Sequence, residues 1–230
     1  PLKAKFGDVP IMLQNDANAC ALAEWQLGAG KGCRNMIFLT FGTGLGAGLI
    51  LNGELYSGTN GMAGEAGHIR LAENGPVGYG KAGSFEGFCS GGGIAQLGQV
   101  MAEEALDREE IPSFCQSKGE LFKVNARTIA EAAEKGDPLA LKIYDIVADR
   151  LGQGLAILVD LLNPEKIVIG SIFLRQEKLL RPRMEKILNK EALEQSLSVV
   201  EVLPAGLGEK LGDYAAVSVG LRAYQKKQKG

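Results

Sequence analysis

Residues 36–56 read Met-Ile-Phe-Leu-Thr-Phe-Gly-Thr-Gly-Leu-Gly-Ala-Gly-Leu-Ile-Leu-Asn-Gly-Glu-Leu-Tyr, and this stretch decides the fold. The run 36–41 is apolar except for Thr40, which predicts a buried strand. Residues 47–51 predict a second strand, and Asn52-Gly53 is a strong hairpin signal before a third strand at 54–56. The stretch therefore predicts three strands in a meander, with a glycine-rich loop at its first turn.

The segments on either side of the meander alternate between helical and strand patterns. The pattern after it predicts helices at 94–105, 125–135 and 138–162, a strand at 166–169, a helix to about 188, a strand at 198–203 and a helix at 213–224. Before the meander, residues 11–14 predict a short strand and residues 17–27 a helix that ends at Gly28. This order predicts an α/β fold in which helices pack on a mixed sheet.

The composition excludes several classes of protein. The 230 residues are 46% hydrophobic and 23% charged, which excludes a disordered chain. A net charge of -2 offers no basic surface for nucleic acid. No apolar run approaches the ~20 residues of a membrane span, and no secretory signal peptide is visible. The four cysteines lack a Cys-x-x-Cys spacing, which favours a cytoplasmic protein with free thiols.

Asn15-Asp16 is the first candidate for chemistry. The pair precedes an alanine-rich helix, where the free N–H groups and the helix dipole stabilise an ionised carboxylate. One interpretation is a plain helix cap. The other is a general base that takes a proton from a substrate hydroxyl.

Three further segments combine glycine with polar side chains. The loop 42–46 between two strands could offer N–H groups to a phosphate, with Thr43 adding a hydroxyl, or it could be an ordinary hairpin turn. In 61–68, the single histidine of the chain, His68, follows Glu65 by three residues, and a structural histidine is an equal alternative. In 80–86, Glu86 could bind a ligand or serve as a cap or a solvated acid.

Taken together, these segments resemble the ROK family (repressor, open reading frame, kinase) of bacterial sugar kinases and sugar-sensing repressors. The resemblance extends over nearly the whole chain, and its matching residues are 15–19, 39–48, 63–69, 163–170 and 211–216. It implies an actin-like, hexokinase-like (ribonuclease H-like) lobe. It also implies transfer of the γ-phosphoryl group of ATP, with Mg²⁺, to the hydroxyl of a hexose or N-acetylhexosamine, usually the 6-hydroxyl.

The family pattern also implies roles for individual residues. Asp16 resembles the catalytic base, and the expected sugar ligands are Asn15, Glu65, His68 and Glu86. The expected phosphate loop is Gly42-Thr43-Gly44, and Gly170-Ser171 lies where the family has its adenosine-binding turn. Expected partners are a hexose or amino sugar and a second copy of the chain in a homodimer, without nucleic acid or membrane.

The sequence departs from the family pattern at two places. No strand with an Asp and a first phosphate loop precedes Asn15, so a truncated kinase is expected, with 1–30 as the end of an N-terminal lobe and 31–230 as the C-terminal lobe. Such a fragment is expected to be inactive alone. Val77, Tyr79 and Ser84 replace the three cysteines of the family's zinc motif. No structural zinc is therefore expected, and burial of Tyr79 and Phe85 is expected to hold the loop instead.

The retention of Asp16 and of the phosphate loop favours a kinase. The alternative is the sugar-sensing domain of a ROK-type transcriptional repressor, whose DNA-binding helices would lie outside these 230 residues. The sequence does not identify the sugar.

Overall fold

Strand β1 (Met36–Phe41) lies at the centre of the main sheet in the computed structural model, which describes residues 2–229. It pairs antiparallel with β2 (Leu45–Leu51) and parallel with β6 (Lys166–Ile169). Strand β3 (Glu54–Tyr56) follows β2, and β7 (Glu201–Pro204) lies beyond β6, so that the order within these residues is β3-β2-β1-β6-β7. Both Asn52 and Gly53 have positive φ, at 54° and 79°, as a two-residue hairpin turn of type I′ requires. The predicted meander is confirmed.

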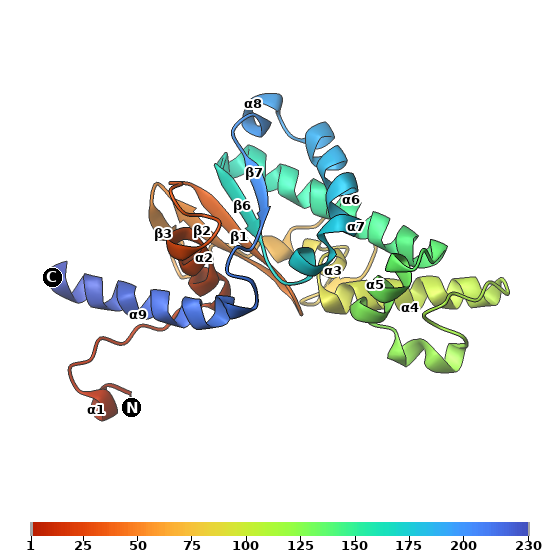
Figure 1. The fold of residues 1–230 in the computed structure, drawn as a ribbon, viewed down its shortest axis with the longest axis horizontal. Helices are drawn as coiled ribbons and strands as arrows, with labels where there is room; N and C mark the ends of the chain where they lie inside the picture. Colours follow the sequence, from red (N-terminus) through yellow and green to blue (C-terminus); the bar gives the residue numbers. More distant parts are fainter. Residues whose placement is uncertain (1, 230) are drawn as a thin grey trace.

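The sheet is buried on both faces because successive side chains of a strand alternate. Met36 and Phe38 point to one face and pack against α2 (Asp16–Leu27) and α9 (Leu211–Lys229). Ile37 and Leu39 point to the other face, where the large core lies against α6 (Pro138–Leu162) and α7 (Ile172–Glu191). Figure 1 shows α9 extending away from one side of the sheet, and α4 and α5 extending from the other.

The remaining elements surround this layered core. Two of them are well-formed helices, α4 (Gly91–Asp107) and α5 (Ala126–Glu134). The short helical elements are α1 (Leu2–Phe6), η1 (Ala66–His68), α3 (Phe85–Phe88), η2 (Lys118–Lys123), α8 (Glu194–Leu197) and η3 (Gly208–Lys210). Strands β4 (Val77–Gly78) and β5 (Lys81–Ala82) form a separate small hairpin.

The predicted helices are confirmed, and two predicted strands need correction. Residues 11–14 are not a strand, because none of the described strands pairs with them. The last strand begins at Glu201, since α8 and a turn occupy 194–199. The glycine-rich region 57–93 contains η1, β4, β5, α3 and the start of α4.

Glu24 on α2 is a buried carboxylate with 0% of its surface exposed. It accepts hydrogen bonds from the N–H groups of Ala29 at 2.8 Å, Gly206 at 3.1 Å and Leu207 at 2.9 Å. A Cβ at Gly28 would overlap this carboxylate, which explains the glycine at the end of α2. Glu24 therefore fastens the end of α2 to the segment between β7 and α9.

Candidate active site

The loop between β1 and β2 is fixed at both ends by backbone and side-chain hydrogen bonds. The Thr40 hydroxyl accepts from the N–H of Gly46 at 2.9 Å and closes the base of the loop. At the tip, the Gly42 N–H donates to the Gly44 carbonyl at 3.0 Å, and the Gly91 N–H of α4 donates to the Gly42 carbonyl at 2.7 Å. The loop therefore has a defined shape and a defined place against the start of α4.

Helix α2 brings Asn15 and Asp16 beside this loop. The Asn15 side chain caps the helix by accepting from the N–H groups of Ala17 and Asn18, and the Asp16 carboxylate accepts from Ala17 at 2.8 Å. A Cβ at Gly48 of β2 would collide with the Ala17 carbonyl, so the missing side chain lets the helix approach the strand closely. Asn15 is thus the cap, which leaves the exposed Asp16 carboxylate facing the space above the loop.

Two glycines place Glu65 on the other side of the same space. The Ala47 N–H donates to the Gly64 carbonyl at 2.8 Å, and Gly64 has φ of 96°. Any Cβ on Gly64 or Gly67 would overlap a carbonyl of β2. Small residues are needed here because the backbone of 61–68 lies directly on β2. This contact places Glu65 opposite Asp16, across the space above the β1–β2 loop.

Glu86 lies half-buried at the start of α3, where its carboxylate holds a neighbouring strand and also lines the space above the β1–β2 loop. Its Oε2 atom accepts from the Leu45 N–H at 2.9 Å, which ties α3 to the beginning of β2. A Cβ on Gly44 would lie 2.9 Å from the same oxygen. A side chain at residue 44 would therefore disturb both the β1–β2 loop and Glu86.

These segments enclose a first cavity of about 430 Å³, here called the acidic cavity. Three carboxylates line it, those of Asp16, Glu65 and Glu86. The other lining residues are Asn15, Ala17, Thr40, Gly42, Thr43, Gly44, Leu45, Gly46, Ala47, Gly61, Ala63, Gly64 and Ser171. Three carboxylates can accept hydrogen bonds from a ligand that has several hydroxyl groups.

Two residues expected at the site do not line the acidic cavity. His68 is exposed; its ring meets Tyr79 edge-on with centroids 6.4 Å apart, and its carbonyl accepts from Lys81. Gly170 is buried against the Phe38 ring and donates its N–H to the Leu39 carbonyl. The next residue, Ser171, is the one that reaches the cavity.

A second cavity of about 510 Å³ adjoins the first and is here called the arginine cavity. It contains Arg127 and Arg175, and none of the described residues that line it is acidic. Three helices present their N-terminal ends to it: α4 through Gly91, α5 through Ala126 and α7 through Ile172. The remaining lining residues are Gly42, Thr43, Gly92, Asn125, Ala130, Tyr144, Ser171 and Gln176. Free N–H groups and helix dipoles at such ends attract anions.

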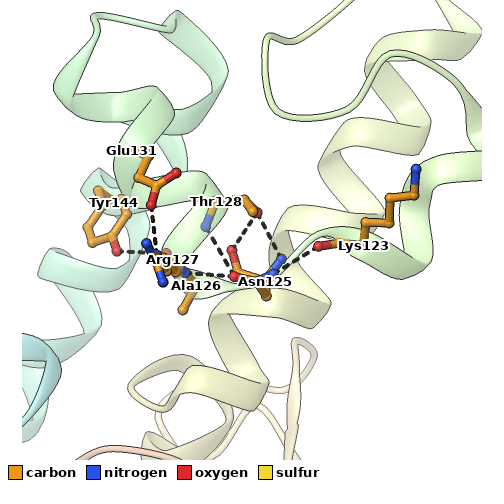
Figure 2. Close-up of polar contacts among 7 residues, drawn as sticks. All are labelled: Lys123, Asn125, Ala126, Arg127, Thr128, Glu131 and Tyr144. Carbon is orange, nitrogen blue, oxygen red and sulfur yellow. Dashed lines mark hydrogen bonds and ion pairs between the residues drawn. The ribbon is translucent and has the colours of Figure 1, made fainter.

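Figure 2 shows how the α5 side of the arginine cavity is held. Asn125 and Thr128 form a reciprocal capping box, and the Asn125 amide donates to the Lys123 carbonyl at 2.9 Å. The Arg127 guanidinium donates to Glu131 at 2.7 Å, and the Tyr144 hydroxyl donates to the Ala126 carbonyl at 3.3 Å. Burial raises the pKa of the Tyr144 hydroxyl, so it remains a neutral donor. Of the residues that line this cavity, the sequence had indicated Gly42, Thr43 and Ser171 for the nucleotide but neither arginine, since the arginines come from distant segments.

The two cavities share a wall made of Gly42, Thr43 and Ser171. A group bound in one cavity therefore lies next to a group bound in the other. The three carboxylates of one cavity and the two arginines of the other therefore lie on opposite sides of this wall.

The cysteines near the site are unsuited to covalent catalysis. The four thiols, Cys20, Cys33, Cys89 and Cys115, are free. Burial raises the pKa of Cys20 to about 11, and the carboxylates of Asp16 and Glu24 add to the shift. This thiol, one turn after Asp16, stays protonated and is a poor nucleophile at neutral pH.

The loop that carries the altered zinc motif is held by hydrogen bonds and by one aromatic ring. Gln96 of α4 clamps the Val77 backbone, accepting from its N–H at 2.9 Å and donating to its carbonyl at 3.0 Å. Ser84 is buried and caps α3. Phe85 is fully buried as expected, but the expected burial of Tyr79 is wrong, since it is 90% exposed. Tyr79 has φ of 44° at the tip of the β4–β5 hairpin, which turns its ring outward.

The described residues contain no group of three His, Cys, Asp or Glu side chains that could hold a metal ion. We expect elemental analysis of the purified protein to find less than ~0.2 zinc per chain, whereas a closed structural site would approach one. Chelation with EDTA should leave the melting temperature unchanged. Stoichiometric zinc, or a large loss of stability with the chelator, would contradict this prediction.

None of the helices between residues 2 and 229 is both long and apolar enough to span a bilayer. The arrangement of the sheet and helices is the actin-like, hexokinase-like fold. A ROK family glucokinase from Streptomyces griseus, solved with glucose and AMPPNP, has a TM-score of 0.79 and 29% identity. The match covers 96% of this chain and 71% of that one.

The ROK family model matches residues 1–219, so the chain belongs to the ROK family. A glucokinase of Halalkalibacterium halodurans is 36% identical over 92% of this chain and 64% of its own length. An N-acetylglucosamine repressor of Escherichia coli O157:H7 is 32% identical over 91% of this chain and 50% of its own length. The chain therefore spans about two thirds of the kinase relative and half of the repressor.

Proposed function

We propose that the protein phosphorylates a hydroxyl of a hexose or N-acetylhexosamine with ATP, the 6-hydroxyl being the expected acceptor. The observation that carries this proposal is the pair of adjoining cavities, one with three carboxylates and one with two arginines, separated by a shared wall. The similarity to glucokinases supports the same reading.

The acidic cavity is suited to the sugar. Glu65, Glu86 and the Asn15 amide can accept or exchange hydrogen bonds with several ring hydroxyls. Asp16 is the proposed general base. As the sugar oxygen attacks the γ-phosphorus, the bond from that phosphorus to the β-phosphate oxygen breaks, ADP leaves, and the hydroxyl proton passes to the Asp16 carboxylate.

The arginine cavity is suited to the nucleotide. Its helix ends and its two guanidinium groups favour phosphate oxygens, and the β1–β2 loop offers the backbone N–H groups of Thr43 and Gly44 at the boundary. Mg²⁺ bound together with ATP would neutralise charge that develops on the phosphate oxygens during transfer. The protein's own task is to position the two substrates and exclude water between them.

A sugar-sensing role is the second candidate, favoured by the similarity to the N-acetylglucosamine repressor. A sensor would need the acidic cavity but no nucleotide and no base. The two candidates therefore differ in whether the arginine cavity binds ATP.

Crossed variants test the assignment of the two cavities. We expect Glu65→Gln to raise the Kd for sugar about 10-fold and to leave the Kd for AMPPNP·Mg²⁺ within about twofold, since a hydrogen bond to a charged group is lost. We expect Arg175→Ala to raise the Kd for AMPPNP·Mg²⁺ about 10-fold and to leave the Kd for sugar within about twofold. Arg175 pairs with Glu209 at 3.3 Å, with side chains 53% and 82% exposed, so its loss should not unfold the protein.

With the full-length protein, calorimetry with glucose, N-acetylglucosamine and AMPPNP measures these constants, and a coupled assay measures ADP formation. Arg108→Ala is the matched control. Arg108 is also paired with a glutamate, Glu110, but it lines neither cavity. Sugar binding without nucleotide binding or ADP formation would favour the sensor. Loss of both affinities in either variant would refute the division between the cavities.

A further inference from the structure

The β4–β5 hairpin packs beside the acidic cavity, although none of residues 77–82 lines that cavity. Gly78 of β4 is buried against the start of α3, where a Cβ would lie 2.5 Å from the Gly87 nitrogen and 2.8 Å from the Glu86 Cβ. A Cβ on Gly67 of η1 would lie 3.1 Å from the same atom of Glu86. The hairpin and η1 therefore both pack closely on Glu86.

The same hairpin makes two contacts with His68, the last residue of η1. The Lys81 ammonium donates to the His68 carbonyl at 2.8 Å. The Tyr79 ring meets the imidazole edge-on, with centroids 6.4 Å apart and an interplanar angle of 80°. His68 in turn donates its N–H to the Glu65 carbonyl at 3.1 Å. The hairpin thus contacts Glu86 and the single turn that follows Glu65, and these are two of the three carboxylates in the acidic cavity.

Tyr79 is an unfavourable residue for the turn that it occupies. Tyr79 and Gly80 connect β4 to β5 as a two-residue turn. Their φ angles are 44° and 76°, as in a type I′ turn, for which Asn-Gly is a preferred sequence. The Tyr79 ring is 90% exposed, so it adds little to the core. Asparagine would suit the backbone better, but it would lose the ring contact with His68.

We infer that the β4–β5 hairpin positions the sugar-facing carboxylates, with Tyr79 as the positioning residue. This inference rests on the proposed binding of a sugar in the acidic cavity. The Tyr79 ring restrains the His68 imidazole and, through the His68 backbone, Glu65. The missing side chain of Gly78 lets the hairpin rest on Glu86. A ligand that needs several simultaneous hydrogen bonds binds more tightly when its partners are already held in place.

Two substitutions at residue 79 of the full-length protein separate the ring from the turn. Tyr79→Phe keeps the ring, whereas Tyr79→Asn removes it and gives the turn a preferred residue. We expect Tyr79→Asn to raise the Kd for sugar about fivefold, which matches the contribution of a T-shaped aromatic pair. Its Kd for AMPPNP·Mg²⁺ should stay within about twofold, and its melting temperature should not fall, because Asn-Gly suits the turn. Tyr79→Phe should bind sugar within about twofold of the wild type, since it retains the ring.

The ring contact can also be followed by NMR. His68 is the single histidine of these 230 residues, and comparison with His68→Gln identifies its imidazole C–H signals. The ring current of residue 79 acts on these signals, so Tyr79→Asn should move them and Tyr79→Phe should not. Phe122→Asn is the matched control, because Phe122 is also an exposed aromatic residue beside a lysine and lines neither cavity. It should change neither the His68 signals nor the Kd for sugar.

The possible failures are distinguishable. If the wild type binds sugar and Tyr79→Asn keeps the Kd within twofold, the hairpin does not position the carboxylates and the inference is wrong. If Tyr79→Asn weakens sugar and nucleotide binding alike and lowers the melting temperature, residue 79 only supports the fold, and the inference is again wrong. The same holds if Tyr79→Phe weakens sugar binding as much as Tyr79→Asn, because the ring contact is then not the cause.

The proposed function can fail separately from this inference. If the wild type binds sugar but forms no ADP, the kinase proposal fails, while the sugar constants of the Tyr79 variants still decide the role of the hairpin. If the wild type binds neither glucose nor N-acetylglucosamine, the assignment of the acidic cavity to sugar fails and the inference fails with it.

Discussion

In the complete protein, Asp16→Asn is expected to lower kcat by about 10²–10⁴-fold while the Kd for sugar changes only a few-fold. Asparagine keeps the shape of the side chain and its acceptor oxygen toward the Ala17 N–H, which now lies 2.8 Å from the carboxylate. It cannot take the proton of the attacking hydroxyl. The effect should therefore fall on the chemical step, measured as steady-state ADP formation beside calorimetric sugar binding.

Asp213→Asn is the matched control for this experiment. Asp213 also lies in the first turn of a helix, α9, and lines neither of the two cavities. We expect its kcat to stay near that of the wild type. Turnover of Asp16→Asn within threefold of the wild type would remove Asp16 from the role of base.

Glu24→Gln is expected to lower the free energy of unfolding by about 2–4 kcal/mol. The carboxylate of Glu24 is fully buried. It accepts hydrogen bonds from three backbone N–H groups, one just after α2 and two between β7 and α9. Glutamine retains one acceptor oxygen but turns an NH₂ group toward N–H donors, which leaves buried donors without partners. Since whole proteins are stable by only about 5–15 kcal/mol, urea denaturation should show a clear shift of the midpoint.

Glu54→Gln serves as the control for stability. Glu54 pairs with Arg222 at 3.2 Å, but its side chain is 78% exposed, so its loss should cost about 1 kcal/mol or less. An unfolding free energy for Glu24→Gln within 0.5 kcal/mol of the wild type would show that the three N–H groups find other partners. That result would refute the role of Glu24 as the fastener between α2 and the β7–α9 segment.

The local elements of the fold followed from the sequence because their signals are local. Asn52-Gly53 specified the hairpin turn, and apolar residues at steps of three or four specified α6. The Asn15-Asp16 pair and the glycine-containing segments 61–68 and 80–86 contained every carboxylate that the acidic cavity brings together. The strand predicted at 11–14 failed because a strand also needs a partner, which no local pattern supplies.

The sequence by itself determined the α/β class and the order of the central elements, and it indicated the three carboxylates that line the acidic cavity. Tertiary structure alone decided that Arg127 and Arg175 line one cavity, because they come from helices that meet only in the folded chain. It also decided that Tyr79 faces outward and that the backbone of Ser171 has positive φ. It likewise brought Glu24 into hydrogen-bond contact with Gly206, which lies 182 residues later in the sequence. Hydrophobic periodicity reports which face of an element is buried, whereas the partner of a buried charge depends on which segments pack together.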